Sequence, residues 1–238
     1  MSKPDLAIFD LDNTILNGDS DYSMINYLVD INLLDEAAKL KNDNFIKDYQ
    51  QGQLDFNQYT NFALKPYIGK TQDEINEIIL PFVETIIEPM INIFALKLIH
   101  DHHDKGHKIL LASATNELIV NLIAQRLDIN HVIGTKVEFK NNKCSGNFIP
   151  PSALGVGKLK LVETWMRLHK YDNFSGVTFY TDSINDLPLM EAVEFPKAVN
   201  PDTKLEKISI ERGWQVIKLP IIWKEFFFLY NPNENHSQ

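Results

Sequence analysis

The sequence predicts an α/β fold, a doubly wound parallel sheet with a Rossmann-like core and an all-helical region inserted after the first strand. Three short apolar runs, at residues 6–9, 108–115 and 177–183, lead into polar residues. Helical patterns separate them, and strands that alternate with helices are typical of a parallel sheet covered on both faces. A chain of 238 residues, 44% of them hydrophobic, is long enough for one core and a small second domain.

The inserted region follows the first strand directly. From Ser20 to about Glu88, apolar residues recur at helical spacing, as at Ile75 and Ile79, and no strand is predicted. Ligands bind at the carboxyl ends of the strands in open α/β sheets, so this region would stand over that end as a cap. The expected division is a cap of residues 19–88 and a catalytic core of residues 1–18 and 89–238.

The rest of the chain alternates between helices and strands. Further helices are expected at Glu117–Leu127, Lys158–His169 and about Leu205–Arg212. A last strand, VIKL, follows them. Between the first two helices, the segment Val132–Phe148 is predicted to form a hairpin that turns at Asn141 and Asn142 and extends the edge of the sheet.

The composition of the chain limits the expected binding partners and the expected cellular compartment. A net charge of −9 opposes binding to nucleic acid or to an anionic membrane. The single cysteine, Cys144, allows no intrachain disulfide and fits a reducing compartment. We find neither a signal-peptide core nor eighteen consecutive apolar residues, so a cytoplasmic protein is expected. The aromatic tail from Ile221 would pack on the core or on a second subunit, as a monomer or a homodimer.

Polar side chains gather where the predicted strands end. They are Asp10 and Asp12 after the first run, Ser113 and Thr115 in the second, Asp182, Asn185 and Asp186 at the third, and Lys158 after the glycine-rich turn GVG. The carboxyl ends of neighbouring parallel strands meet at one edge, so these groups would lie together. Two carboxylates about 4 Å apart repel by roughly 4 kcal/mol near a protein surface, which calls for a cation. Acids, a hydroxyl and a lysine indicate a site for phosphate and Mg²⁺.

These motifs resemble the haloacid dehalogenase-like superfamily, in its phosphoserine-phosphatase-like branch with a helical cap. The matching parts are DLDNT, Ser113, Lys158 and DSINDLP, and the resemblance extends over residues 7–219. NGDSD, ASATNELIV, YTDSINDLPLMEAV and RGWQVI look most like the bacterial histidinol-phosphatase-like members. The resemblance implies a Mg²⁺-dependent phosphomonoesterase that acts on a small-molecule phosphate ester through an aspartyl-phosphate intermediate.

The residue types suit that chemistry. Asp10 would attack phosphorus as the nucleophile, and Asp12 would act as general acid and then as general base. Mg²⁺ would be bound by Asp10, by the backbone carbonyl of Asp12 and by Asp182. Asp186 is also expected at the metal, where it would orient a bound water, or else it would hold Lys158.

Three further residues are expected to bind the phosphate group. Ser113 and the amide groups that follow it begin a helix, whose N-terminus favours anions. Lys158 would neutralise charge as the transition state spreads over the phosphoryl oxygens. Asn185, within the third polar cluster, completes the predicted phosphate site.

The expected substrate carries an amine. Asp19 lies nine positions after Asp10, where the resemblance to phosphoserine phosphatases implies a contact with the substrate amino group. Those enzymes also bind the substrate carboxylate with a cap arginine, but no arginine occurs between Met1 and His107. Lys65 lacks the guanidinium fork, so histidinol phosphate or phosphoethanolamine is favoured over phosphoserine. Asp21 is expected only to cap a helix.

Some side chains have more than one interpretation. Aromatic cap residues would frame an imidazole ring or form the core of the cap: Tyr22, Tyr27, Phe45, Tyr59 and Phe62. Four histidines near Gly106 are interpreted as a solvated helix end rather than a metal cluster: His100, His102, His103 and His107.

Other functions are also compatible with the pattern. A phosphotransferase or mutase would share this scaffold. A phosphoacceptor signalling domain also combines acids, a hydroxyl and a lysine on a parallel sheet. The second aspartate of DLDNT, placed for acid and base chemistry, and the long helical insertion argue against a signalling domain.

Overall fold

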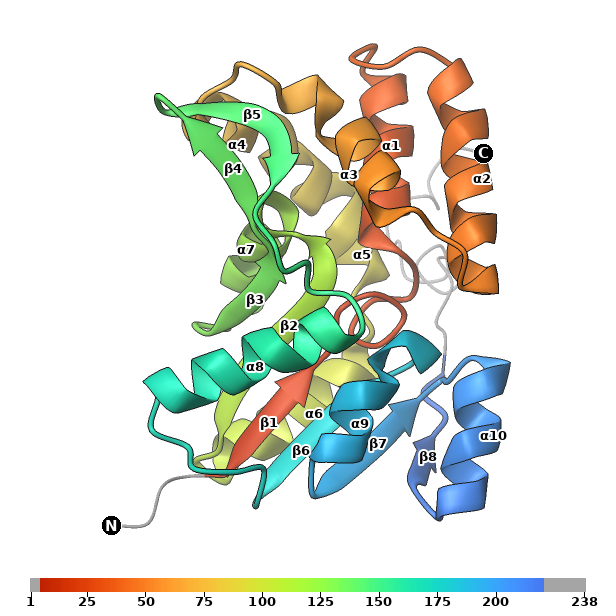
Figure 1. The fold of residues 1–238 in the computed structure, drawn as a ribbon, viewed down its shortest axis with the longest axis vertical. Helices are drawn as coiled ribbons and strands as arrows, with labels where there is room; N and C mark the ends of the chain where they lie inside the picture. The colour runs from red at the N-terminus through yellow and green to blue at the C-terminus, as the bar shows by residue number, and fades with distance from the viewer. Residues whose placement is uncertain (1–4, 221–238) are drawn as a thin grey trace, which may run out of the picture.

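A six-stranded parallel sheet lies at the centre of the computed structural model, which describes residues 5–220 (Figure 1). The strand order is β3-β2-β1-β6-β7-β8, which confirms the predicted doubly wound α/β fold. The strands are β1 Leu6–Phe9, β2 Lys108–Asn116, β3 Val132–Thr135, β6 Val177–Thr181, β7 Phe195–Val199 and β8 Gln215–Ile217. The aromatic tail from Ile221, predicted to pack on the core or on a second subunit, lies outside the described residues.

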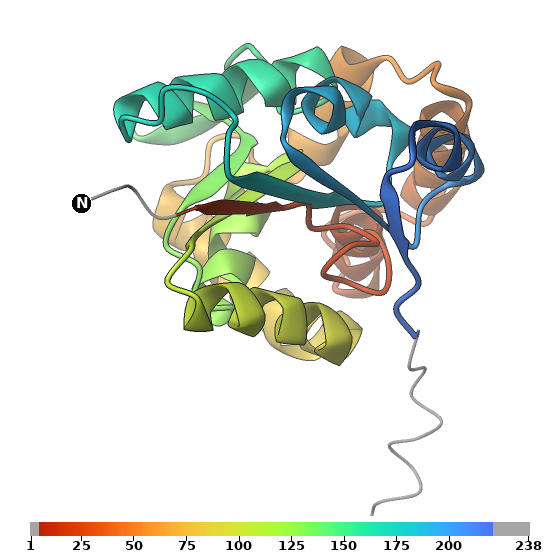
Figure 2. The ribbon, with the colours of Figure 1, turned by 90° about the horizontal axis from the view of Figure 1, so that it is seen from below.

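Helices cover both faces of this sheet. Figure 2 shows α8 and α9 on one side and α6 on the other. Their bounds are α6 Ile93–Asp104, α7 Glu117–Arg126, α8 Val156–Leu168, α9 Leu187–Ala192 and α10 Thr203–Arg212. In β1, Ala7 and Phe9 belong to one core cluster, whereas Leu6 and Ile8 belong to the other. The first strand is therefore buried on both faces, as its unbroken apolar run predicted.

Between β1 and α6, the described chain forms helices and their connecting turns. These helices stand over the carboxyl ends of the strands (Figure 1). They are α1 Ser20–Asp30, α2 Ala37–Gln51, α3 Phe56–Leu64, η1 Lys65–Tyr67, α4 Gln72–Phe82, η2 Val83–Ile87 and α5 Glu88–Met90. The predicted all-helical insertion is confirmed, and we call this group of helices the cap.

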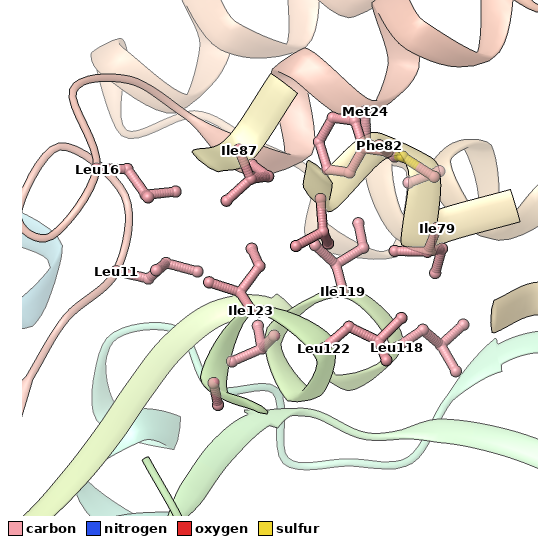
Figure 3. Packing of buried hydrophobic residues seen from close by; sticks show 14 of the residues in the cluster. Leu11, Leu16, Met24, Ile79, Phe82, Ile87, Leu118, Ile119, Leu122 and Ile123 are labelled. Carbon is pink, nitrogen blue, oxygen red and sulfur yellow. The ribbon is translucent and has the colours of Figure 1, made fainter. Parts of the chain in front are cut away.

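The cap packs directly on α7. Met24 of α1 and Phe82 of α4 lie in the same hydrophobic cluster as Ile119 and Ile123 of α7 (Figure 3). All four side chains are at most 2% exposed. Burial of side chains of this size stabilises a fold by about 1.5–3 kcal/mol each. This shared core holds the cap at a defined position over the sheet.

The two segments that lead into and out of the cap are tied to each other. Leu16 and Ile91 form an isolated antiparallel bridge. The Asn17 N–H donates to the Met90 carbonyl at 2.7 Å, and the Asn92 N–H donates to the Ile15 carbonyl at 2.9 Å. None of the helices in the described part of the chain combines the length and the apolar character needed to span a membrane.

The predicted hairpin forms, and it turns where expected. Its strands are β4 Val137–Lys140 and β5 Lys143–Phe148, paired antiparallel. Asn141 and Asn142 have φ values of 51° and 62°. A two-residue hairpin loop with two positive φ values favours asparagine and glycine, which explains the position of the turn.

The hairpin does not extend the main sheet, so that part of the prediction is wrong. It forms a separate two-stranded sheet, and β3 alone continues the sheet edge. Residues of the cap pair with β5: the Gly69 N–H donates to the Cys144 carbonyl at 2.9 Å, and the Cys144 N–H donates to the Lys70 carbonyl at 2.8 Å. Val137 and Cys144 are buried in the core cluster that includes the cap. The hairpin is therefore held by its apolar face and by backbone groups of the cap.

One histidine of the group near Gly106 is buried rather than solvated. His102 is 7% exposed, and its Nε2 lies 2.8 Å from the Tyr180 hydroxyl. Its Nδ1 lies 2.9 Å from Nδ1 of His107. The interpretation as a solvated helix end is wrong for His102, because α6 packs on the sheet there, whereas His100 and His103 are exposed.

Burial of His102 predicts a loss of stability in acid. Burial and the neighbouring His107 lower its pKa from 6.5 to about 4, so the unfolded chain takes up this proton first as the pH falls. Stability is therefore full above about pH 6.5 and decreases down to about pH 4, with about 2 kcal/mol lost at pH 5. Urea unfolding at pH 7.5 and pH 5 measures the difference.

Two variants isolate this contribution. Gln at position 102 keeps a donor and an acceptor without titrating, so His102→Gln is expected to lose about 2 kcal/mol less between the two pH values than the wild type. The exposed His103 is the matched control, and His103→Gln should behave as the wild type does. An equal pH dependence in His102→Gln and the wild type would contradict the assignment.

Candidate active site

The strand ends bring most of the predicted residues to one cavity beneath the cap. Asp10 directly follows β1, and its N–H donates to the Tyr180 carbonyl of β6 at 2.9 Å. Because β1 lies between β2 and β6, the residues that follow those strands surround Asp10. From the core, the cavity is lined by Asp10, Asp12, Thr115, Lys158, Asp182 and Asp186. From the cap, Phe45, Ile46, Tyr49, Leu54, Phe56 and Tyr59 complete it.

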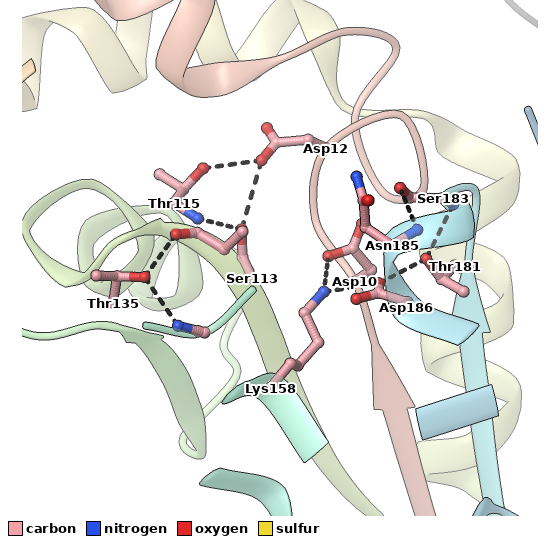
Figure 4. Close-up of polar contacts among 12 residues, drawn as sticks. Asp10, Asp12, Ser113, Thr115, Thr135, Lys158, Thr181, Ser183, Asn185 and Asp186 are labelled. Atoms are coloured by element: carbon pink, nitrogen blue, oxygen red, sulfur yellow. Dashed lines mark hydrogen bonds and ion pairs between the residues drawn. The ribbon is translucent and has the colours of Figure 1, made fainter. Parts of the chain in front are cut away.

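Lys158 joins two carboxylates at the base of the cavity (Figure 4). Its Nζ lies 2.8 Å from Oδ1 of Asp10 and 2.7 Å from Oδ2 of Asp186. The Thr181 hydroxyl also donates to Oδ2 of Asp186, at 2.7 Å. Lys158 is 2% exposed, which disfavours its charged form, but the charges of Asp10 and Asp186 outweigh this effect and raise the pKa of Lys158. The lysine therefore remains an ammonium group beside Asp10.

A glycine-rich turn positions Lys158 in the first turn of α8. Gly155 has a φ of 57°, in the left-handed region that favours glycine. A Cβ atom at Gly157 would clash with the backbone oxygen of Ser152. The glycines of GVGK therefore allow the backbone to pass close to Ser152, and this turn directs Lys158 toward Asp10.

Asp12 is held by hydroxyl and amide donors. Its Oδ2 accepts from the Thr115 hydroxyl at 2.9 Å and from the Ser113 hydroxyl at 3.4 Å (Figure 4). Its Oδ1 accepts from the Ser20 N–H at 2.6 Å. Burial and the charge of Asp19 together raise the pKa of Asp12 to about 6. The hydrogen bonds from Ser20 and Thr115 oppose this rise. The sequence places Thr115 with Ser113 in the second polar cluster but does not indicate that its hydroxyl holds Asp12.

Asp10 and Asp182 are carboxylates in a setting that disfavours their charge. Burial raises the pKa of Asp10 to about 7, against the opposing effect of Lys158. Burial and the charges of Asp10, Asp186 and Asp12 raise the pKa of Asp182 well above its ordinary value. Within residues 5–220, no donor forms a hydrogen bond to the Asp182 side chain, which lines the cavity. Among the described residues that line the cavity, Lys158 is the one cation, and it forms no ion pair with Asp182.

The donor set fits a divalent cation that prefers oxygen. The carboxylates of Asp10 and Asp182 and the backbone carbonyl of Asp12 are hard donors of the kind that Mg²⁺ binds. Lys158 is paired with Asp10 and Asp186, and although its charge partly offsets the rise in the Asp182 pKa, it forms no ion pair with Asp182. No three acidic, histidine or cysteine side chains of the described residues form a metal-binding group. A bound ion would therefore depend on two carboxylates together with backbone and water oxygens.

Asn185 lies beside the cavity rather than within it. It belongs to η3 (Ile184–Asp186) and lines an adjoining pocket with Ser183 and Lys204. Asp19 and Asp182 line both spaces, so the two pockets adjoin at these residues. Among the predicted phosphate-binding residues, Lys158 lines the cavity itself, whereas Ser113 is buried behind it against Asp12.

Helix capping falls to Asp19 and not to Asp21. Oδ1 of Asp19 accepts from the Tyr22 N–H at 2.7 Å, which makes Asp19 the N-cap of α1. Asp21 lies in the first turn of the helix and lines the cavity, as Asp19 does. The expectation that Asp21 only caps a helix is therefore wrong: its carboxylate accepts from Nδ2 of Asn116 at 3.2 Å.

Comparison with known proteins defines the class. The family model of the haloacid dehalogenase-like hydrolases matches residues 7–191. The chain therefore belongs to the haloacid dehalogenase-like hydrolase family, and it is a phosphatase of that family. It is similar to a histidinol-phosphatase of Neisseria meningitidis serogroup C (strain 8013), with 37% identity over 216 residues that cover 89% of this chain and 97% of the relative.

Solved structures agree with this fold. A protein of unknown function from Bordetella pertussis Tohama I has a TM-score of 0.84 at 30% identity, over 91% of this chain and 99% of that one. A phosphoserine phosphatase, solved as a phospho-aspartyl intermediate analogue, has a TM-score of 0.65 at 14% identity, over 97% of this chain and 100% of that one. At that identity the second likeness concerns the fold alone.

Proposed function

We propose that this phosphatase is a Mg²⁺-dependent phosphomonoesterase that hydrolyses a small, amine-bearing phosphate ester, such as histidinol phosphate, through an aspartyl-phosphate intermediate. One observation carries the proposal: Asp10 lies 2.8 Å from the buried ammonium of Lys158, in a cavity where Thr115 holds Asp12 at 2.9 Å. A nucleophile, a counter-charge and a proton donor thus share one space.

In the first half of the reaction, Asp10 displaces the alcohol. A carboxylate oxygen of Asp10 forms a bond to phosphorus, and the bond from phosphorus to the ester oxygen breaks with its electron pair on that oxygen. Asp12 donates a proton to the departing oxygen. Its pKa near 6 supports this role, because a fraction of the side chain is still protonated close to neutral pH.

In the second half, water releases the phosphate. Asp12, now ionised, accepts a proton from a water molecule whose oxygen forms a bond to phosphorus. The bond from phosphorus to the Asp10 oxygen breaks, which regenerates the carboxylate and frees inorganic phosphate. Hydrogen bonds from Thr115 and from the Ser20 N–H support the ionised form of Asp12 and orient it for both steps.

The remaining residues stabilise charge. The amides that follow Ser113 would bind phosphoryl oxygens, while Ser113 itself holds Asp12 from behind the cavity, and Asn185 would approach from the adjoining pocket. Lys158 would neutralise the phosphoryl group, and Asp186 would position Lys158, since one of its oxygens already serves the lysine and Thr181. We assign these groups to a core of residues 1–18 and 89–238, with residues 19–88 as the cap.

Mg²⁺ would be held by the carboxylates of Asp10 and Asp182 and by the backbone carbonyl of Asp12. When bound, it supplies positive charge that binds the phosphoryl oxygens and allows three nearby carboxylates to remain ionised. Asp186 was also expected at the metal. Its ion pair with Lys158 at 2.7 Å supports a positioning role instead.

The charges of the cavity favour a substrate without a carboxylate. Among the described residues that line it, Lys158 is the one cation, and it is already paired. Lys65 is exposed and does not line the cavity. Asp19 offers an anion to a substrate amine, and the similar histidinol-phosphatase acts, by its name, on an ester of this kind.

A substrate comparison tests the proposal. With Mg²⁺ present, kcat/KM for histidinol phosphate is expected to exceed that for phosphoserine at least about tenfold, because no arginine among the described lining residues offsets the carboxylate of phosphoserine. EDTA should remove most of the activity and added Mg²⁺ should restore it. Phosphate release should not change when alcohols are added as acceptors, which distinguishes a hydrolase from a phosphotransferase. A preference for phosphoserine would contradict the substrate assignment.

A further inference from the structure

Asp21 is an acidic group of the cavity that the proposed chemistry does not use. It lines the cavity together with Asp10, Asp12, Asp19, Asp182 and Asp186, and Lys158 is the one cation among the described lining residues. Lys158 is bonded to Asp10 and Asp186, and the proposed metal would serve Asp10, Asp12 and Asp182. Asp19 and Asp21, on the side of the cap, are left for the part of the substrate beyond the phosphate.

The side chain of Asn116 bonds to Asp21 and does not cap its own helix. It occupies the N-cap position of α7 but forms no capping hydrogen bond with its side chain. Its Nδ2 donates instead to Oδ1 of Asp21 at 3.2 Å, although asparagine at this position ordinarily accepts from the helix N–H groups. The Tyr59 hydroxyl also interacts with Asp21 and stabilises its carboxylate. Two elements, β2 and α3, thus direct neutral donors at one carboxylate.

Unpartnered polar atoms lie beside this carboxylate. Asn116 is 6% exposed, and its Oδ1 has no hydrogen-bond partner. The hydroxyl of Tyr67, 1% exposed, also lacks a partner, and the charge of Asp21 helps to raise the pKa of Tyr67. Buried acceptors without donors are rare in folded proteins. Neither Asn116 nor Tyr67 lines the cavity, so the acceptor that a ligand meets here is the Asp21 carboxylate, which suits a ligand that brings an N–H group.

Aromatic rings form the wall next to Asp21. Phe45 and Tyr59 line the cavity, with their ring centroids 5.4 Å apart in an edge contact. Phe62 packs against Phe45 from behind, also at 5.4 Å. Flat aromatic walls beside an anion favour a planar cation or a ring that carries an N–H group. Asp19 also lines the adjoining pocket, whereas Asp21 lines the cavity and interacts with Tyr59, so Asp21 is the carboxylate placed beside the aromatic rings.

We infer that Asp21 is a specificity-determining residue, which binds a second nitrogen-bearing group of the substrate, a planar N–H ring, while Asp19 receives the amine. This inference rests on the proposed function, because it assigns the groups of the same substrate to two carboxylates. Asn116 and Tyr59 act as positioning residues that fix the direction of the Asp21 carboxylate. The preferred esters therefore carry two nitrogen groups. A simple aminoalkyl phosphate would contact Asp19 but not Asp21.

The test compares selectivity rather than activity. For wild type and Asp21→Asn, kcat/KM is measured with Mg²⁺ for histidinol phosphate and for 4-nitrophenyl phosphate, which has no N–H group. The ratio of the two values is expected to fall at least about tenfold in Asp21→Asn, because the amide has no charge and, with its one oxygen accepting from Asn116, presents an NH2 group to the N–H donor of the substrate. Asp21→Glu, which keeps the charge, should retain a ratio within about threefold of the wild type. Asp73→Asn, an exposed change in α4, should leave the ratio unchanged.

The outcomes separate the inference from the proposed function. If the wild type cleaves 4-nitrophenyl phosphate but not histidinol phosphate, the proposed substrate is wrong. If it cleaves both and Asp21→Asn keeps the wild-type ratio, the inference about Asp21 is overturned. Should Asp21→Asn not fold, inhibition of the wild type decides: histidinol should inhibit 4-nitrophenyl phosphate hydrolysis at least about tenfold more strongly than ethanolamine, which lacks the ring. Equal inhibition by the two amines overturns the inference.

Discussion

Replacement of Asp10 by asparagine is expected to lower kcat for phosphate esters by at least about 10⁴-fold, the scale seen when a catalytic nucleophile is removed. An amide does not form the aspartyl phosphate, whereas its shape is close to that of the carboxylate. The measurement is steady-state hydrolysis of 4-nitrophenyl phosphate with Mg²⁺. Acid quenching with a ³²P-labelled substrate should trap phosphoprotein in the wild type and none in Asp10→Asn.

The same variant should remain folded. Burial raises the pKa of Asp10 to about 7, so the ionised carboxylate destabilises the folded chain. A neutral amide removes this desolvation cost. Lys158 keeps its second partner, Asp186, at 2.7 Å. We therefore expect the free energy of unfolding of metal-free Asp10→Asn at pH 8 to equal or exceed that of the wild type. Phosphatase activity close to the wild-type value in this folded variant would rule out Asp10 as the nucleophile.

Replacement of Lys158 by methionine is expected to damage both stability and activity. The change leaves Asp10 and Asp186 buried without their shared ammonium, and breaking a buried ion pair in this way costs about 3–5 kcal/mol. The loss of charge at the phosphoryl group should also lower kcat/KM at least about 10³-fold. Urea unfolding and steady-state kinetics measure the two effects separately.

A double variant distinguishes the ion pair from the catalytic charge. Lys158→Met with Asp186→Asn removes one uncompensated carboxylate, so it should recover part of the lost stability but none of the activity. Lys160→Met, an exposed change on the same helix, is the matched control and should alter neither quantity. A Lys158→Met protein as stable as the wild type would show that the buried pair does not stabilise the fold.

The central residues of the site could be predicted from local sequence because the reactive side chains directly follow the predicted strands. Leu6–Phe9 is a continuous apolar run whose residues alternate between two core clusters, and such a run predicts a strand buried on both faces. In a parallel sheet the next residues must emerge at the carboxyl edge, which brings Asp10 and Asp186 together there, and the first turn of α8 adds Lys158. The glycine turn before Lys158 could also be found in the sequence, since it reflects backbone geometry.

Other features depend on contacts between distant segments, and local patterns do not report them. The residue pattern of β4 and β5 predicts a hairpin but does not say what the hairpin packs on. Its apolar face would be buried equally well at the edge of the main sheet or against the cap. His102 occurs in a polar run near a helix end, yet Tyr180, 78 residues away, buries it. Neither outcome follows from periodicity, which describes a single element at a time.

The sequence by itself determined the sheet, the helical insertion and the meeting of acids, hydroxyl and lysine at the strand ends, because periodicity and motif spacing are local. Only the tertiary structure decided which carboxylate each donor serves. Asn116 turns from its own helix to Asp21, 95 residues away, and Asp186 holds Lys158, 28 residues away. Hydrogen bonds of this kind depend on distances of a few ångströms between elements, which packing sets and sequence spacing does not.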